Sequence, residues 1–178
     1  MARLPLRTAR LLLRPVIDRD LPHLIAILGD SEVMKLALYE RPLGPDEAKQ
    51  FIAEAFSKEA EDVTHLGVLC RGGDHAVVGF AGLLPCKYFP GDLELGFVLA
   101  AEHQGKGYAT EIARTLLDVG FEVLKCERLI ALCDPRNVGS SRVLEKLGMI
   151  CIDEISTLDR GRRRVFKIAR ANASEALY

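Results

Sequence analysis

The chain of 178 residues has no excess of charge of either sign. Its 24 lysines and arginines nearly balance 25 aspartates and glutamates, which leaves a formal net charge of −1. A general affinity for polyanions is therefore not expected, because nucleic-acid binding would need a local basic patch. The sequence predicts no direct contact with nucleic acid.

Long apolar runs are absent as well. No stretch approaches the roughly 18 consecutive apolar residues that a membrane-spanning helix needs, so no membrane association is expected. Near the N-terminus, residues 11–13 are leucines, but Arg14 and Pro15 follow at once. This run is too short for the apolar region of a secretory signal.

Paired cysteines are a third absence. The sequence has no C-x-x-C pair, and its cysteines are odd in number and widely spaced: Cys70, Cys86, Cys126, Cys133 and Cys151. Such usage favours free thiols in a reducing compartment over a disulfide framework. A cytoplasmic location is expected.

The composition, with 49% hydrophobic and 28% charged residues, is that of a globular protein, and the length suits one domain over residues 1–178. Hydrophobic periodicity predicts strands over 10–15, 63–70, 76–84, 92–99, 128–133, 149–158 and 163–169. Helices should follow Asp18, Pro45, Gly107 and Asn137. Short connections favour an antiparallel meander for three of the strands, and a strand reached through a helix should run parallel to its predecessor. The order βααβββαβαββ predicts an α+β domain with a mixed, mainly antiparallel sheet flanked by helices.

Residues 93–117 read as an apolar strand, a short glycine-containing loop and an amphipathic helix. Gly105 and Gly107 leave little side chain between the backbone and a ligand over the helix start. The first amides of a helix lack intrahelical partners and carry partial positive charge. This arrangement favours an anion such as a pyrophosphate.

Two well-known phosphate loops do not fit. A Walker loop requires G-x-x-x-x-G-K-[ST], whereas Lys106 is followed by glycine. A dinucleotide-binding fold is disfavoured because Thr110 stands in place of the third glycine and a meander precedes the loop.

A third motif does fit. Residues 104–109, QGKGYA, match the [QR]-x-x-G-x-[GA] signature, and the chain is therefore similar to the GCN5-related N-acetyltransferases, the GNAT superfamily. Residues 8–15, TARLLLRP, resemble the opening strand of the branch that includes ribosomal-protein N-terminal acetyltransferases. Residues 137–149, NVGSSRVLEKLGM, resemble that branch's N-x-x-S…EK-x-G-F motif, with Met149 in place of the aromatic residue. The resemblance implies a GNAT-like sheet with a splay between its fourth and fifth strands.

The resemblance further implies acetyl-CoA as cosubstrate and no metal. Its pyrophosphate would accept hydrogen bonds from backbone amides of the loop, namely those of Gln104, Gly105, Lys106, Gly107, Tyr108 and Ala109. The pantetheine arm would lie in the splay between residues 94–99 and 129–133. Backbone groups of Phe97, Val98 and Leu99 would contact the arm, and Asn137 would bond to it. The sequence alone allows Asn137 to be only a helix cap.

For the chemistry, Glu94 is the candidate base, unless it lies on the exposed face of an alternating strand. Many family members carry a tyrosine acid seven residues after the motif asparagine, where this chain has Leu144. The resembling branch places a serine near the helix start in that role, which indicates Ser140, with Ser141 second. A purely capping role for Ser140 is also open.

The pKa of the acceptor amine decides how much help it needs. At pH 7, roughly a tenth of an α-amine with a pKa near 8 is neutral, whereas fewer than about one lysine amine in a thousand is neutral. The lack of an obvious histidine–carboxylate pair is compatible with an α-amine acceptor.

Four arginines, Arg160, Arg162, Arg163 and Arg164, crowd an expected hairpin tip. They could rim the acceptor cleft and attract an acidic substrate or ribosomal RNA, or they could form a solvated turn.

The overall expectation is an N-acetyltransferase that works by direct attack of a primary amine, with the N-terminal α-amine of a protein or peptide favoured. The alternatives are a small amine (an amino acid, polyamine or aminoglycoside) and a non-catalytic acyl-CoA-binding module. Relatives of the family are commonly dimers, so a homodimer is also open.

Overall fold

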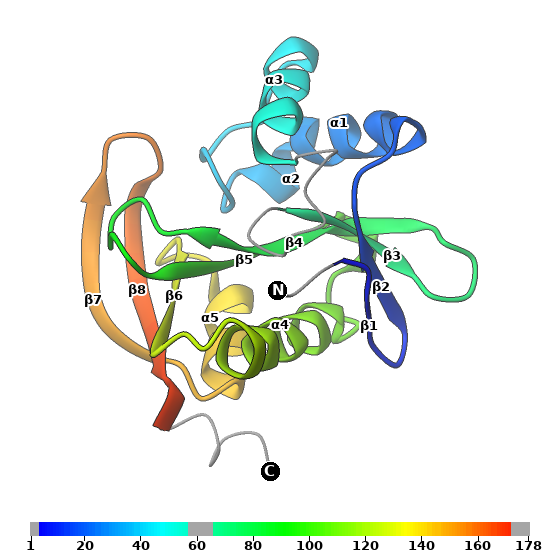
Figure 1. The fold of residues 1–178 in the computed structure, drawn as a ribbon. Helices are drawn as coiled ribbons and strands as arrows, with labels where there is room; N and C mark the ends of the chain where they lie inside the picture. Colours follow the sequence, from blue (N-terminus) through cyan, green and yellow to red (C-terminus); the bar gives the residue numbers. More distant parts are fainter. Residues whose placement is uncertain (1–3, 57–65, 172–178) are drawn as a thin grey trace.

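A computed structural model describes residues 4–56 and 66–171. Within these residues, eight strands form one sheet in the order β1-β2-β3-β4-β5-β6-β8-β7, with helices on both faces (Figure 1). The strands are β1 (Leu6–Arg7), β2 (Leu11–Arg14), β3 (Gly67–Arg71), β4 (Val77–Pro85), β5 (Leu93–Leu99), β6 (Arg128–Cys133), β7 (Ile150–Thr157) and β8 (Gly161–Ala169). The helices are α1 (Leu21–Gly29), α2 (Ser31–Met34), α3 (Pro45–Ala55), α4 (Tyr108–Asp118) and α5 (Val138–Lys146). In the described part of the chain, no helix is long and apolar enough to cross a membrane.

The predicted mixed α+β sheet is confirmed. Strands β3, β4 and β5 form the antiparallel meander, and β6, reached through α4, runs parallel to β5. Among the strands and α-helices, two short elements were not predicted: the two-residue strand β1 and the four-residue helix α2. The side chain of Asp30 caps α2 by accepting hydrogen bonds from the amides of Glu32 and Val33. The first residues of the strand expected over 63–70 lie outside the described residues.

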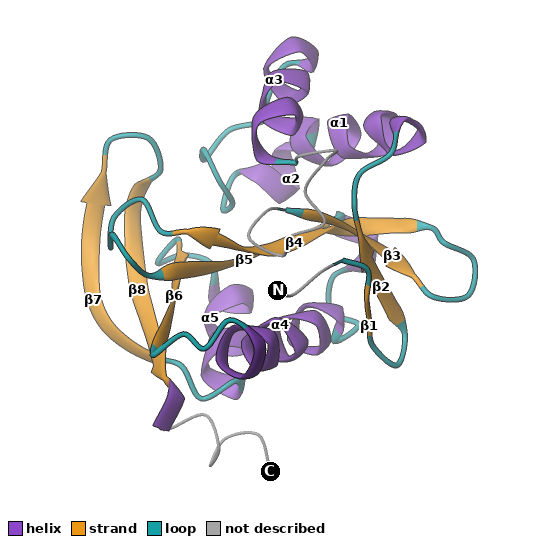
Figure 2. Ribbon diagram, in the orientation of Figure 1, coloured by secondary structure: helices purple, strands orange, loops and turns teal. Residues whose placement is uncertain are grey.

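The sheet separates two hydrophobic cores, and this follows from the amphipathic helices on its two faces. Helices α1, α2 and α3 cover one face, and α4 and α5 cover the other (Figure 2). Leu24 of α1 and Ile52 of α3 are buried in the first core, whereas Ile112 of α4 and Leu144 of α5 are buried in the second. The sheet therefore presents one face to each helical layer.

Strands β5 and β6 diverge, as the predicted splay requires. They are paired only at Leu93 with Leu129 and at Glu94 with Ile130. Beyond these pairs, β5 stays with β4 as far as Leu99, and β6 stays with β8 as far as Cys133. The sheet therefore opens between the carboxyl ends of β5 and β6.

Candidate active site

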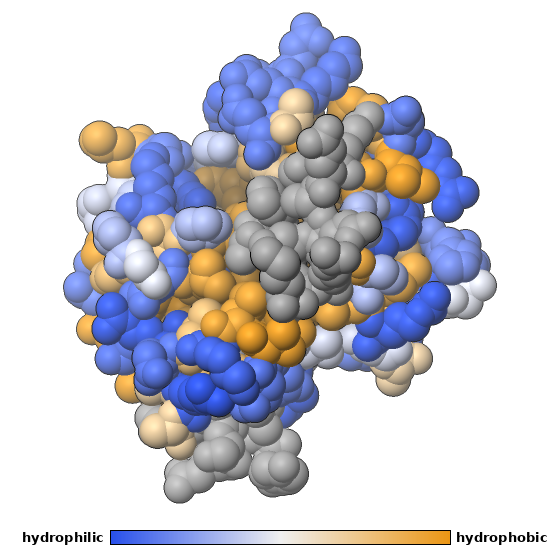
Figure 3. All heavy atoms as spheres, viewed as in Figure 1, coloured by the Kyte–Doolittle hydropathy of each residue, from blue (hydrophilic) through white to orange (hydrophobic). Residues whose placement is uncertain are grey.

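A cavity of about 520 Å³ lies where β5 and β6 separate. It is lined from one side by the glycine loop and the start of α5, and from the other by the α2–α3 region and the aromatic side chains beside it. Figure 3 shows apolar side chains gathered in the middle of the molecule, with hydrophilic surface above and below them. The cavity thus connects the two faces of the sheet.

The glycine loop has the backbone geometry of an anion site. Gly105 has φ +73° and Gly107 has φ +80°, left-handed values that glycine adopts at little steric cost. Gly107 is the N-cap of the eleven-residue helix α4, so the free amides of the first turn start here. Gln104 is fixed by its Nε2 donating to the carbonyl of Leu99 at 3.1 Å. These residues fit the pyrophosphate of acetyl-CoA.

The expected cofactor residues lie mostly together. The cavity lining includes Phe97, Val98, Leu99, Gln104, Gly105, Gly107, Tyr108, Ala109 and Asn137. Lys106 is not among the lining residues, and its backbone carbonyl accepts a hydrogen bond from Arg10 Nη1 at 3.0 Å. That carbonyl is thereby held by the turn between β1 and β2.

Arg10 is itself held by Glu111, in the first turn of α4. The Glu111 carboxylate accepts from Thr8 Oγ1 at 2.5 Å, from the Arg10 amide at 2.8 Å and from Arg10 Nε at 2.6 Å. Burial opposes the ionised form of Glu111, but these hydrogen bonds prevail and lower its pKa. The Arg10 guanidinium also lies 4.8 Å from the Tyr108 ring centroid. Together these contacts fix the loop against the start of the sheet.

Arg10→Ala should therefore raise the Michaelis constant for acetyl-CoA about tenfold with little change in kcat. The loop would lose a charge-assisted hydrogen bond to the Lys106 carbonyl, and such bonds contribute on the order of 1.5–3 kcal/mol. Steady-state kinetics with acetyl-CoA varied would measure the change. Arg7→Ala, in the adjoining strand, is the matched control and should leave the constant unchanged. Equal effects of the two variants would show that Arg10 does not position the loop.

Glu94 is buried, with 6% of its surface exposed, and lines the cavity. The alternative that it lies on an exposed strand face is wrong. Its Oε1 accepts a hydrogen bond from Arg160 Nη1 at 2.7 Å. Strand β5 thus places a carboxylate inside the cavity, paired with a guanidinium from the β7–β8 turn.

The arginine-rich turn is only in part a solvated turn. Arg162 is exposed and pairs with Glu154, but Arg160 and Arg163 line the cavity, and Arg163 is 2% exposed. The turn is attached to the β4–β5 loop through Asp159, which accepts from Lys87 Nζ at 2.7 Å and from the Tyr88 hydroxyl. The hydrogen bond from Lys87, followed by that from Tyr88, lowers the pKa of Asp159 to about 2.

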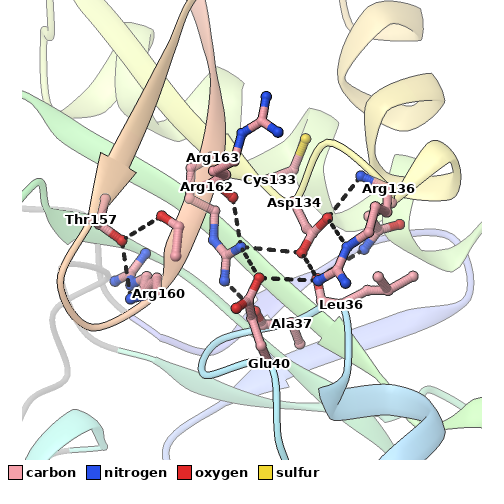
Figure 4. A network of polar contacts seen from close by, with 12 residues as sticks. Leu36, Ala37, Glu40, Cys133, Asp134, Arg136, Thr157, Arg160, Arg162 and Arg163 are labelled. Atoms are coloured by element: carbon pink, nitrogen blue, oxygen red, sulfur yellow. Dashed lines mark hydrogen bonds and ion pairs between the residues drawn. The ribbon is translucent and has the colours of Figure 1, made fainter.

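Arg163 joins the loop after α2 to the end of β6 (Figure 4). Its Nη2 donates to the Ala37 carbonyl at 2.9 Å, and its Nη1 lies 3.4 Å from Asp134 Oδ2. Asp134 also accepts from Arg136 Nη2 at 2.7 Å, and this contact is the main reason why its pKa falls to about 2. Glu40 pairs with Arg136 at 3.0 Å and with Arg163 at 3.5 Å. The network fixes the loop after α2 to the sheet.

The start of α5 separates the two candidate serines. Asn137 caps the helix by accepting from the Ser140 amide at 2.9 Å, and its Nδ2 donates to the Leu36 carbonyl at 3.3 Å. Ser140 lines the cavity, as does Asn137. Ser141 is buried, with its Oγ 3.5 Å from Cys133 Sγ, and does not line the cavity. The geometry therefore favours Ser140 over Ser141 as the hydroxyl near the reacting atoms.

Sequence reasoning missed several residues of the site. Arg10 acts through contacts with residues about a hundred positions away, and local patterns do not show such contacts. Arg163 was named with the other arginines of the turn, but its contact with the Ala37 carbonyl was not expected. Phe51 and Leu84 line the cavity but were not expected to do so. The aromatic residues were the available signal, because half-buried aromatic rings often mark binding surfaces.

The five cysteines are free, and the thiols of Cys70, Cys86 and Cys133 are buried. Burial raises the pKa of the Cys133 thiol and keeps it from acting as a ready thiolate. Among the described residues, no group of histidine, cysteine and acidic side chains could hold a metal ion.

Comparison with known proteins identifies the family. The model of the acetyltransferase (GNAT) domain matches residues 10–150. The uncharacterized N-acetyltransferase YnaD of Bacillus subtilis is 34% identical over 143 residues, which cover 80% of each chain. The spermidine N(1)-acetyltransferase of Escherichia coli (strain K12) is 28% identical over 138 residues, covering 76% of this chain and 70% of that protein. A crystal structure of a GNAT-family acetyltransferase from Bacillus anthracis superposes with a TM-score of 0.79 at 27% identity, covering 94% of this chain and 99% of that one. The chain belongs to the GNAT family of N-acetyltransferases, which use acetyl-CoA as acyl donor.

Proposed function

We propose that the acceptor is the N-terminal α-amine of a peptide or protein. The observation that carries this proposal is the charge of the cavity, because both carboxylates that line it among the described residues are already paired with arginine. Glu94 pairs with Arg160, and Asp134 pairs with Arg136 and Arg163. A polyamine or an aminoglycoside carries several positive charges and would need unpaired carboxylates. The arginines instead favour an acceptor rich in carbonyl oxygens, such as a peptide.

The chain supplies two groups for the proton transfers. Acetyl-CoA supplies the activated acyl group; the amine nitrogen bonds to the acetyl carbon, the C–S bond breaks, and the amine loses a proton. Glu94 receives this proton through water on the carboxylate oxygen that Arg160 does not occupy. Ser140, at the start of α5, donates a hydrogen bond to the departing sulfur and relays a proton to it from water. An α-amine is roughly a tenth neutral at pH 7, so this modest assistance suffices.

Ser140→Ala should lower kcat for a peptide acceptor about tenfold to a hundredfold and leave the Michaelis constant for acetyl-CoA unchanged. The loss follows from removal of a proton donor, while the cap of α5 survives because it uses the backbone amide of Ser140. Single-turnover and steady-state thiol release would measure it. Ser141→Ala is the matched control, since that hydroxyl faces Cys133, and should retain activity. A larger loss in Ser141→Ala would reverse the assignment.

The acceptor class is tested by thiol release from acetyl-CoA with three kinds of amine at equal concentration. These are peptides with a free N-terminus, the same peptides with a blocked N-terminus and an internal lysine, and spermidine. We expect turnover with the free peptides, and mass spectrometry should place one acetyl group on the α-amine. Faster turnover of spermidine would overturn the proposal. Tight CoA binding without turnover of any amine would instead indicate a binding module.

A further inference from the structure

We propose that the site selects acceptors whose first side chain is bulky and apolar, of the leucine, methionine or phenylalanine class. This inference rests on the proposed α-amine function and specifies which N-termini are used. It starts from the register of β4 and β5, in which Leu84 lies opposite Glu94 and Phe80 lies opposite Val98. Directly opposed residues of antiparallel strands point to the same face of a sheet. The carboxylate assigned as base therefore has an apolar neighbour on its own face.

Between these two pairs, β4 and β5 place no side chain on this face, because Gly82 lies opposite Gly96. A Cβ built on Gly96 would have no heavy atom within 4 Å, which shows open space above this residue. Gly96 also lines the cavity. An amine placed beside Glu94 thus has room next to it for a substituent.

Three aromatic side chains, those of Tyr39, Phe51 and Phe80, lie on the α1–α3 face beside this open space, and we call them the aromatic wall. The rings of Tyr39 and Phe51 meet edge to face with centroids 6.2 Å apart, and Phe51 lies 6.3 Å from Phe80. Ala55, one turn after Phe51 on α3, lines the same cavity. Its small side chain leaves the wall recessed at that point.

Folding leaves part of this wall uncovered. Tyr39 is 37% exposed, and Phe51, Ala55 and Leu84 are half-buried although apolar. Apolar surface that lines a cavity beside a reactive group gains free energy when an apolar ligand covers it. The same cavity is also lined by Arg160 and Arg163, which pair with Glu94 and Asp134. An apolar first side chain would lie over Gly96, and the peptide backbone would extend toward the arginines.

The test is a series of peptides that differ only in the first residue: glycine, serine, alanine, leucine, methionine, phenylalanine and glutamate. We expect kcat/KM for the leucine-first peptide to exceed that for the glycine-first peptide by at least about thirtyfold. Each apolar group that fits a pocket raises kcat/KM severalfold or more. Ala55→Leu should fill the recess and lower kcat/KM for phenylalanine-first about tenfold, while alanine-first changes little. Ala53→Leu makes the same substitution on the exposed side of α3 and should change neither.

The amides of leucine and glycine, which lack a peptide chain, complete the series. If free peptides are acetylated equally well whatever their first residue, or if glutamate-first is preferred, the apolar pocket is overturned and the α-amine function stands. If no peptide is acetylated but leucinamide is strongly preferred to glycinamide, the peptide function falls and the pocket stands. Equal effects of Ala55→Leu and Ala53→Leu would also overturn the assignment of the pocket to α3.

Discussion

Glu94→Gln should lower kcat/KM for a peptide acceptor about a hundredfold at pH 7 with the fold intact. The amide oxygen can still accept the hydrogen bond from Arg160, so the half-buried guanidinium keeps its partner, but the side chain can no longer take a proton. General base catalysis contributes about a hundredfold to ten-thousandfold, and the lower figure applies because part of the α-amine is already neutral. Thiol release with a leucine-first peptide would measure the effect.

The pH profile makes this prediction specific to proton transfer. The gap between the wild type and Glu94→Gln should narrow above about pH 8, where most of the α-amine is neutral without assistance. Glu154→Gln serves as control, since Glu154 is an exposed carboxylate that pairs with Arg162 on the same hairpin. A constant ratio from pH 6 to 9 would assign Glu94 to the positioning of Arg160 and not to the base.

Arg163→Ala should lower the free energy of unfolding by about 3 kcal/mol, because removal of one member of a buried ion-pair network leaves its partners unsatisfied. The Ala37 and Leu38 carbonyls would lose their donor, and Asp134 would keep only Arg136. The loop after α2 carries part of the aromatic wall, so the Michaelis constant for the acceptor should also rise. Urea unfolding followed by circular dichroism would measure the first effect, and acceptor kinetics the second.

Arg162→Ala provides the comparison, because it removes the neighbouring arginine, which is exposed and pairs only at the surface. Exposed pairs typically contribute less than about 1 kcal/mol, so this variant should unfold near the wild-type midpoint. A similar loss in both variants would mean that the buried network does not hold the loop. An unchanged Michaelis constant for acetyl-CoA is expected in both.

Most of the fold could be predicted because the signals that define it are local. The period of apolar residues changes where α3 gives way to β3, and Pro45 and Asn137 mark helix starts at their observed positions. Helix α2 was missed because four residues are too few for a periodic pattern, and its stability comes from the Asp30 cap and burial of Val33 and Met34. Strand β1 was missed for a similar reason, since two residues cannot show alternation.

The site could be predicted only where a motif is contiguous. Residues 104–109 and Asn137 are read directly from the sequence, and they line the cavity except for Lys106. The pairing of Glu94 with Arg160 joins residues 66 positions apart, and Arg163 reaches a carbonyl 126 positions away. No local pattern encodes those distances, so the arginines around the β7–β8 turn look solvated although Arg160 pairs with Glu94 of β5. The choice between Ser140 and Ser141 likewise depended on which way α5 faces.

The sheet that opens between β5 and β6 also separates two sets of residues that can be substituted independently. The glycine loop adjoins the core beneath α4 and α5, and the proposed acceptor wall adjoins the separate core beneath α1 and α3. Substitutions in distant, non-touching groups of residues usually have additive effects. Residues such as Tyr39 and Ala55 can therefore vary without disturbing the loop at Gly105. Such a fold can change the amine that it accepts while the glycine loop stays the same. The α1–α3 layer is therefore the natural target for redesigning acceptor selectivity.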